Sequence, residues 1–307
     1  MKSGFGLLLL VLLLASCGLE TAHSDKSQKL VIASDFLYPK DSMLFKNFTK
    51  KRKIRICVEH LSADSIQKRL AKEGYNSTFD LVFVKSLKGV KALEKTKFQR
   101  LSKRNLNENL DNLKAFHHRE WLVLGLDPYL FSFVPDTLEY PDTYKQLTQK
   151  YNWATPNIDE LDVLLIHAKQ QLKKGKKYNY KVWRKGFFKN NLPFVAGTDS
   201  TLSRQFLVLK NSTFQKDSLF EKARKKRELI YPNQNVGGSY ADRVCAAIVF
   251  QAKDYDNANA LLKYLNSREV MYYFNLRNGF INYPRKNGRI DGLKMLLISE
   301  DKLLRLL

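Results

Sequence analysis

The sequence predicts an α/β fold in which helices cover a mixed, mostly parallel sheet. Short apolar runs alternate with segments of helical spacing in the first third of the chain, which is typical of strand–helix–strand units. Two longer apolar runs, at residues 121–134 and 244–250, are candidates for long strands that cross between parts of the fold. The 307 residues, 44% of them hydrophobic, are enough for one large domain or for two lobes of ordinary size.

The folded body is expected to begin near Lys29 with a strand, a helix and a second strand. Residues 30–33 and 54–58 are short apolar runs suited to buried strands, and residues 40–50 place apolar side chains at helical spacing. These elements open the predicted sheet.

A second helix is expected from Ser62 to Gly74. Ser62 is a suitable N-cap, Gly74 is a suitable stop, and Ile66, Leu70 and Ala71 are expected to share one face. The apolar run at residues 80–84 then predicts a third buried strand.

Ligands of such folds bind at the carboxyl ends of the strands. This rule places the expected site near residues 34–38 and near Lys85.

The second half of the chain alternates in the same way. The segments expected to be helical are residues 159–172, 180–189, 201–209, 256–264 and 267–276, the last of them ending at Gly279. No internal repeat or low-complexity block interrupts this pattern.

The first residues resemble a bacterial lipoprotein signal. Lys2 precedes an apolar stretch at residues 7–14, which is too short to span a bilayer, and Leu-Ala-Ser-Cys at residues 14–17 resembles the lipobox. The resemblance implies a signal peptide at 1–16, a lipid anchor on Cys17 and a tether at 17–28. It also implies an exported protein on the periplasmic side of a bacterial membrane. The alternative is an ordinary secreted protein in which Cys17 is incidental.

The strong positive charge indicates an anionic partner. The chain has 53 Lys and Arg against 30 Asp and Glu, a formal charge of +23. Export and the lack of stacking aromatics among the basic runs exclude nucleic acid, which leaves an anionic membrane surface or a small anionic solute. Cys57 and Cys245 lie in apolar runs without the neighbouring ligands of a zinc or redox site, and a disulfide between them stays open.

Several collinear segments resemble the ferric-iron-binding branch of periplasmic solute-binding proteins. They are residues 30–45, 74–83, 121–133, 141–147, 183–200 and 231–284, the last with a Leu-x-x-Tyr-Leu-x-Ser-x-Glu turn of helix. The resemblance implies a two-lobed type II periplasmic binding protein fold with two crossover hinge strands. One lobe is expected at residues 29–118 plus 245–279 and the other at 119–244 plus 280–307.

The resemblance also implies a role. A protein of this kind is not an enzyme and needs no cofactor; it closes on a small solute and delivers it to an ABC permease and its ATPase. The metal ligands of the family fall by collinear placement on Leu37, Lys85, Thr213 and Phe214, none of which suits a hard trivalent cation. We therefore expect an anion or a chelated metal, and the identity of any metal is left unknown. The predicted contacts are Tyr38, Lys85, Asn157, Ser200, Asn211 and Thr213.

Two other functions are weighed against this one. A lipoprotein of the same fold with an emptied metal site would serve as a partner-binding or sensory protein without transport. An exported hydrolase has no constellation behind it, because Ser200 lacks a Gly-x-Ser-x-Gly elbow and no histidine follows it. His117 and His118 are adjacent and are expected in an exposed loop rather than a metal site.

Overall fold

Three apolar runs near the start of the chain form neighbouring strands. They are β1 (Lys29–Ser34), β2 (Arg55–His60) and β3 (Leu81–Val84). The computed structural model describes residues 28–101, 119–135, 140–148, 151–174, 180–195, 206–282, 289–290, 293–296 and 305. β1 pairs in parallel with β2 on one side and with β3 on the other, as the strand–helix alternation predicts.

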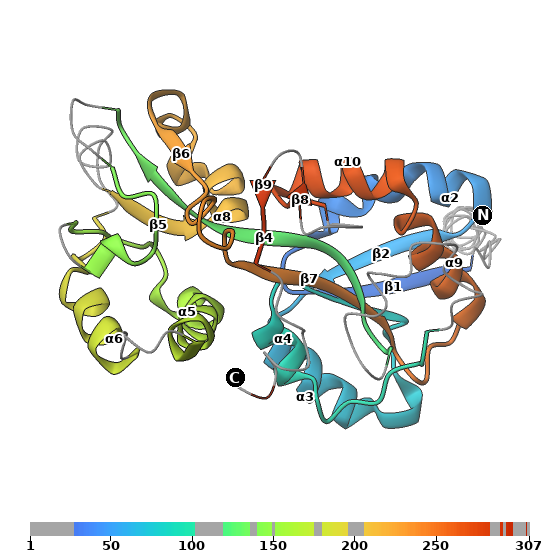
Figure 1. The fold of residues 1–307 in the computed structure, drawn as a ribbon. Coiled ribbons are helices and arrows are strands. Elements are labelled where there is room, and N and C mark those ends of the chain that lie inside the picture. The colour runs from blue at the N-terminus through green and yellow to red at the C-terminus, as the bar shows by residue number, and fades with distance from the viewer. Residues whose placement is uncertain are drawn as a thin grey trace, which may run out of the picture.

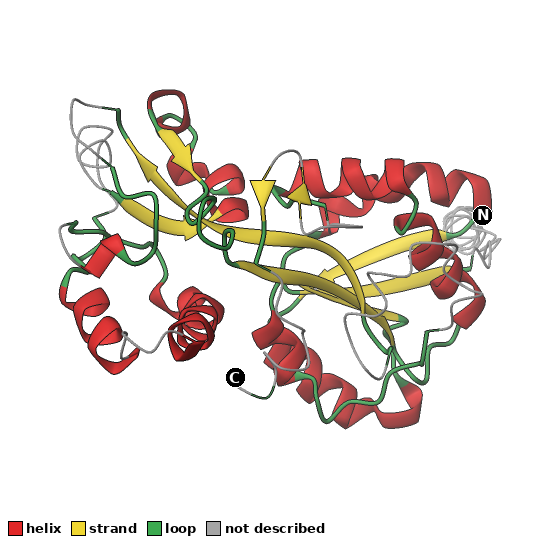
Figure 2. Cartoon of the chain, in the orientation of Figure 1, coloured by secondary structure: helices red, strands yellow, loops and turns green. Residues whose placement is uncertain are grey.

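Helices cover both faces of these strands (Figure 2). They are α2 (Lys46–Arg52), α3 (Ala63–Glu73), α4 (Leu87–Ala92), α9 (Tyr255–Leu265) and α10 (Arg268–Asn278). Since side chains alternate along a strand, Val31 belongs to the core that includes α3 and α4. Its neighbour Ile32 belongs to the core that includes α2, α9 and α10. The first lobe is therefore a three-layer sandwich.

Two long strands run from the first lobe into the second (Figure 1). They are β4 (Leu122–Phe133) and β7 (Ala241–Ile248), which pair antiparallel and are buried along their whole length. β7 also pairs with β3, and the strand order of the large sheet is β2-β1-β3-β7-β4-β5. The prediction of two crossing strands is confirmed.

The second lobe is built on the far end of β4. There β4 pairs antiparallel with β5 (Leu207–Lys210) and β6 (Glu228–Ile230). Around these strands lie α5 (Asp162–Lys174), α6 (Tyr180–Lys189) and α8 (Asn211–Lys216). The short elements are β8 (Arg289–Ile290), β9 (Leu293–Lys294) and the 3-10 turns η1 (Pro39–Phe45), η2 (Gly74–Asn76), η4 (Gln146–Thr148), η5 (Ile158–Leu161), η6 (Ser218–Phe220) and η7 (Ala223–Lys226).

The sheet is more mixed than the sequence predicts. Only the β1–β2 and β1–β3 pairs among the described strands of the large sheet are parallel, whereas every pair made by β4 or β7 is antiparallel. The two crossing strands run in opposite directions, β4 from the first lobe to the second and β7 back again, and β7 is also antiparallel to β3. Alternation along the chain therefore predicts the parallel pairing of β1 with β2 and β3 but not the antiparallel pairs.

Three local predictions need correction. A helix is expected over residues 201–209, but residues 207–209 belong to β5, because this short apolar run is buried against β4. Residues 201–205 lie outside the described residues. Residues 40–50 start as the 3-10 turn η1 after Pro39 and become helical only at Lys46. Ala71 is exposed, whereas Ile66 and Leu70 are buried as expected.

Two further features concern possible membrane-spanning helices and the cysteines. In the described part of the chain, no helix has the length and apolar character needed to cross a bilayer. Cys57 and Cys245 are thiols, the first partly exposed on the edge strand β2 and the second buried in the crossing strand β7.

Candidate ligand-binding site

A cavity of about 800 Å³ lies between the lobes, beside the crossing strands. Its walls come from the carboxyl ends of β1 and β3, from η1 and η5, from α8 and from the end of α10. The lining residues are Asp35, Phe36, Tyr38, Lys40, Asp41, Met43, Lys85, Glu160, Ser212, Thr213, Lys216, Asp217, Ser218, Arg277, Asn278 and Phe280. Because distant segments contribute to one space, a solute held there would contact both lobes.

The first-lobe wall is organised by two carboxylates. Asp35 follows β1 directly and accepts a hydrogen bond from the backbone N–H of Lys85 at 2.9 Å, which ties the ends of β1 and β3 together. Burial raises the pKa of Asp35 to about 6, although Lys85 favours the ionised form. Asp41 accepts from the N–H of Tyr38 at 2.9 Å, and the Tyr38 ring stacks on His60 with 4.0 Å between centroids.

The second-lobe wall is formed by α8. Thr213 Oγ1 lies 3.3 Å from Glu160 Oε2, and Lys216, one turn later, donates to Asn278 Oδ1 at 2.7 Å. α8 is held in place at its start, where the N–H of Ser212 donates to Asp127 Oδ1 at 2.9 Å. The face of α8 that carries Thr213 and Lys216 is therefore fixed toward the cavity.

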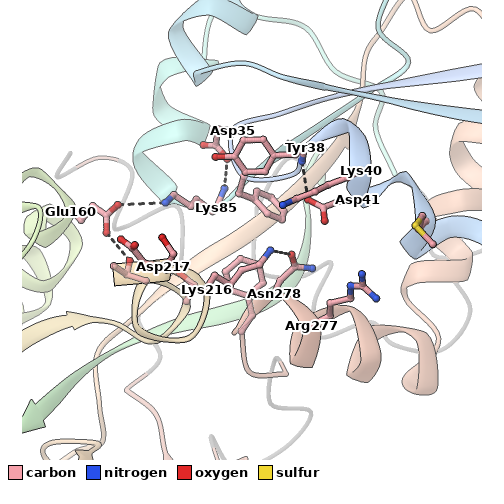
Figure 3. Close-up of a pocket in the computed structure, with 16 residues that line it drawn as sticks. Asp35, Tyr38, Lys40, Asp41, Lys85, Glu160, Lys216, Asp217, Arg277 and Asn278 are labelled. Carbon is pink, nitrogen blue, oxygen red and sulfur yellow. Dashed lines mark hydrogen bonds and ion pairs between the residues drawn. The ribbon is translucent and has the colours of Figure 1, made fainter. Parts of the chain in front are cut away.

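Two ion pairs cross between the lobes. Lys85 Nζ lies 3.4 Å from Glu160 Oε1, and Lys88 Nζ lies 3.0 Å from Asp162 Oδ2. Figure 3 shows Lys85 between Asp35 and Glu160, with Glu160 also contacting the α8 side. Burial alone would raise the pKa of Glu160, but Lys85 and Lys210 outweigh it and the pKa is lowered, so Glu160 is a carboxylate at neutral pH.

A buried ion pair lies beneath the cavity. Lys210, at the end of β5, is 2.8 Å from Asp242 Oδ2 in β7, and both side chains are almost fully buried. Asp242 Oδ1 also accepts from the N–H of Leu87 at the start of α4. Burial opposes the charge of Lys210, but Asp242 and the nearby Asp127 outweigh it and hold the pKa of Lys210 well above its ordinary value. This pair joins the second lobe to a crossing strand and to the first lobe.

Three cations line the cavity without a carboxylate partner. Within the described part of the chain, no ion pair joins Lys40, Lys216 or Arg277 to an acidic group. Partial burial lowers the pKa of Lys216, and the positive charges of Lys40 and Arg277 lower it further against the opposing effect of Asp41. The three side chains therefore bring positive charge to a cavity that the carboxylates of Asp35, Asp41, Glu160 and Asp217 also line, but none of the three is held in an ion pair with a described residue.

The structure brings together some of the residues predicted from the sequence. Tyr38, Lys85 and Thr213 line the cavity. Asn157 does not, because it caps η5 and accepts from the N–H of Asp159 at 3.1 Å. Asn211 is buried behind the wall and donates to the carbonyl of Gly279 at 2.8 Å. Ser200 and Cys17 lie outside the described residues.

Several lining residues have only weak signals in the sequence. Asp35 follows a predicted strand, and Lys216 lies one helical turn after Thr213, so both could have been added to the site by position. Arg277 and Asn278 lie at the end of α10, which contacts α8 of the second lobe although the two helices are far apart in the sequence. Only the fold shows that they face the same space.

The four family ligand positions are also placed by the fold. Leu37 is fully buried and Phe214 is nearly so, in apolar cores, whereas Lys85 and Thr213 line the cavity. Among the residues that the structure describes, no group of three or more His, Cys, Asp or Glu could hold a metal ion.

Comparison with solved structures decides the fold. A Trichodesmium protein (IdiA, FutA), solved with iron and citrate, has a TM-score of 0.70 at 18% identity, over 91% of this chain and 98% of that one. The fold is that of the ferric-binding proteins. The ferric-binding protein of Campylobacter jejuni matches with a TM-score of 0.70 and 19% identity, over 90% of this chain and 95% of that chain.

A third ferric-binding-protein fold is similar in an open conformation. It is the ferric iron-binding protein A of Mannheimia haemolytica, with a TM-score of 0.70 and 15% identity, over 91% of this chain and 97% of that chain. No protein-family model and no curated protein sequence matches the chain. At these identities the similarity establishes the ferric-binding-protein fold, as the collinear segments predict, and not the ligand.

Proposed function

We propose that this chain is the substrate-binding lipoprotein of an ABC-type importer and that it binds an anionic solute or a metal chelated by an anion. The observation that carries the proposal is the cavity between the lobes, into which Lys40, Lys216 and Arg277 bring positive charge that no ion pair with a described residue neutralises. The two-lobed fold, shared with solute-binding proteins rather than enzymes, supports a role in binding.

The carboxylates of the cavity are less available to a ligand than the cations. Each of them already accepts a hydrogen bond from the protein. Asp35 accepts from Lys85 N, Asp41 from Tyr38 N, Glu160 from Lys85 Nζ and Thr213 Oγ1, and Asp217 from Leu219 N. An incoming anion would find the ammonium groups of Lys40 and Lys216 and the guanidinium of Arg277, none of them in an ion pair with a described residue. Such groups form strong charge-assisted hydrogen bonds with carboxylate or phosphate oxygens.

Bare ferric iron fits this cavity poorly. A hard trivalent cation requires anionic oxygen donors, and Leu37, Lys85, Thr213 and Phe214 supply none at the positions implied by the family resemblance. Lys85 moreover brings positive charge to this region, which repels a bare cation. A metal would have to arrive with its negative charge supplied by a chelating anion.

Export, anchoring and domain division complete the proposal. Residues 1–16 act as the signal peptide, Cys17 is acylated, and the body is held by residues 17–28 at the periplasmic side of the membrane. Residues 29–118 plus 245–279 form one lobe and 119–244 plus 280–307 the other. The lobes close about β4 and β7 by hinge motion and present the solute to a permease.

Thermal unfolding with a panel of ligands tests the proposal. The protein is compared with phosphate, sulfate and citrate, with ferric citrate, and with ferric iron alone. A ligand at about a hundred times its Kd stabilises the protein by about 2.7 kcal/mol. We expect an anion-dependent shift that is lost in the double variant Lys216→Gln, Arg277→Gln. The control variant Lys222→Gln, Lys225→Gln, which changes exposed lysines of the second lobe by the same charge, should keep it.

The other outcomes separate the alternatives. A shift that requires ferric iron and no added anion contradicts the anion proposal and restores the family's ligand. No shift with any of the compounds contradicts the transport role and favours a partner-binding or sensory lipoprotein of the same fold.

A further inference from the structure

A dense group of basic side chains surrounds the point where the folded body begins. This basic patch consists of Lys29, Lys46, Lys50, Lys51, Arg52, Lys53 and Arg55, all of them exposed. The sequence contains no Asp or Glu between Asp41 and Glu59. None of the seven forms an ion pair with a residue that the structure describes.

The fold gathers these residues from three elements. Lys29 opens β1 and is the register partner of Arg55, which opens β2. Lys46 and Lys50 lie one turn apart on α2, and Lys50, Lys51 and Arg52 form its last turn, so the helix delivers its cations next to the start of β2. Packing of Phe48 and Ile54 into the core fixes the backbone on which the cations stand.

So many like charges repel one another, and no ion pair with a described residue offsets them. The patch also lacks exposed aromatic side chains, since Phe48 is buried, and it is not a stacking surface for bases. A broad, flexible set of lysines suits a diffuse layer of negative charge. Anionic lipid headgroups provide such a layer, and each cation near it strengthens binding roughly fivefold at low ionic strength.

The position of the patch in the chain points to the same partner. Gln28 leads directly into β1, and its carbonyl accepts from the N–H of Arg55 at 2.8 Å. Cys17, the proposed lipid anchor, precedes Gln28 by 11 residues, a stretch that can extend at most about 40 Å. An anchored molecule would therefore hold this end of the first lobe within reach of the membrane surface.

We propose that the basic patch around α2 and the starts of β1 and β2 docks the first lobe onto anionic lipid headgroups of the membrane. The docking rests on the export proposed above but not on the identity of the solute. It adds a second contact with the membrane to the proposed lipid anchor on Cys17.

Lysine acetylation of the full chain, followed by mass spectrometry, tests the docking. The chain is mixed with vesicles of phosphatidylcholine alone or with added phosphatidylglycerol. We expect the anionic lipid to slow acetylation of Lys50, Lys51 and Lys53 several-fold, and high salt to reverse the effect. Lys222, Lys225 and Lys226 are exposed lysines of the second lobe and serve as the internal control, with unchanged rates. Equal slowing at both clusters, or none, overturns the proposal.

Matched charge reversals give an independent measurement. The variant Lys50→Glu, Lys51→Glu, Arg52→Glu should lose at least about a hundredfold in binding to the anionic vesicles. The variant Lys222→Glu, Lys225→Glu, Lys226→Glu changes the net charge equally and should stay within about twofold of the unmodified chain. Equal losses would mean that net charge alone drives the association and would refute a docking patch. Solute-dependent thermal shifts, measured in parallel, should be unaffected by either triple variant.

Discussion

Lys85 and Glu160 form an ion pair across the cavity, with 3.4 Å between Nζ and Oε1. Lys85 follows the last parallel strand of the first lobe, and Glu160 belongs to η5 of the second. A second pair repeats the connection, from Lys88 in the first turn of α4 to Asp162 at the start of α5. The lobes are therefore joined in two ways, covalently through the crossing strands and electrostatically at the front of the cavity.

Removing both ion pairs should let the two lobes move apart without unfolding the protein. The pairs are partly exposed, so the double variant Glu160→Gln, Asp162→Asn should change the free energy of unfolding by no more than about 1 kcal/mol. Small-angle scattering at low salt should show a larger radius of gyration. The control Glu73→Gln removes a pair with Arg69 inside the first lobe and should leave the radius unchanged. Identical radii for all three proteins would contradict this prediction.

Reversing the charge of Lys85 should abolish anion binding. The Lys85→Glu variant places a second carboxylate beside Glu160 at the cavity wall, which repels an anionic solute. Thermal shift with the anion that binds the unmodified protein measures the loss, and circular dichroism checks the fold. Lys88→Glu also breaks a pair between the lobes, but Lys88 does not line the cavity, so this variant should retain binding. Unchanged affinity in Lys85→Glu would remove Lys85 from the site.

The buried pair Lys210–Asp242 should be costly to break from one side. Lys210→Met leaves the Asp242 carboxylate buried without its cation, which typically costs roughly 3–5 kcal/mol. Urea unfolding should show this loss. The double variant Lys210→Met, Asp242→Asn should recover part of it, because the amide carries no charge and its oxygen can still accept from Leu87 N. A loss under about 1 kcal/mol for the single variant would show that water replaces the lysine.

The contribution of Asp127 to stability should fall as the pH rises from about 4 to 6. Burial raises the pKa of Asp127 from 3.8 to about 6, although Lys210 and Ser212 favour the ionised form. A carboxyl whose folded pKa is raised favours the folded state below its unfolded pKa, and this contribution is lost as the pH rises through the folded pKa. This shift of the Asp127 pKa corresponds to about 3 kcal/mol in the free energy of unfolding. In urea unfolding across this range, the stability of Asp127→Asn relative to the unmodified protein should therefore rise with pH.

Asp35 has a raised pKa in the same range, so it contributes a loss of stability of the same sign. The stability of Asp35→Asn, Asp127→Asn relative to the unmodified protein should therefore rise with pH more steeply than that of Asp127→Asn. A profile that is the same in the variants and in the unmodified protein would contradict the assignment of the slope to these two groups.

Gly279 should not tolerate a side chain. Its φ is +69°, and an added Cβ would lie 2.9 Å from Gln215 Cβ and 3.0 Å from the Ser212 backbone. Gly279→Ala should therefore destabilise the fold by about 1–3 kcal/mol and disturb the contact of α10 with α8. At Gly237 an added Cβ would meet no atom within 4 Å and φ is not positive, so Gly237→Ala is a matched control with little effect on the melting temperature. Similar melting temperatures for both variants would refute the close-approach argument.

Local signals in the sequence predict much of this fold because they act within a few residues. Ser62 and Gly74 cap α3 as expected, α6 spans the predicted residues, and Gly279 ends α10 in the left-handed conformation. β5 is missed because its four residues are too few to show a helical or a strand periodicity. Their pairing with β4, which is remote in the sequence, makes them a strand. The site is only half predictable for a related reason. Tyr38, Lys85 and Thr213 follow from strand ends and collinear placement, whereas Lys40, Lys216 and Arg277 become a group only through contacts between lobes.

The thiols of Cys57 and Cys245 can be used to measure how fast the strands that connect the lobes separate. Cys57 lies on the edge strand and is partly exposed, so a thiol reagent should reach it in the native state. Cys245 is fully buried in β7, with Val84 and Val123 as register partners on either side. Its labelling requires separation of β7 from β3 or β4, and the slow labelling phase would thus give the rate at which the connection between the lobes comes apart.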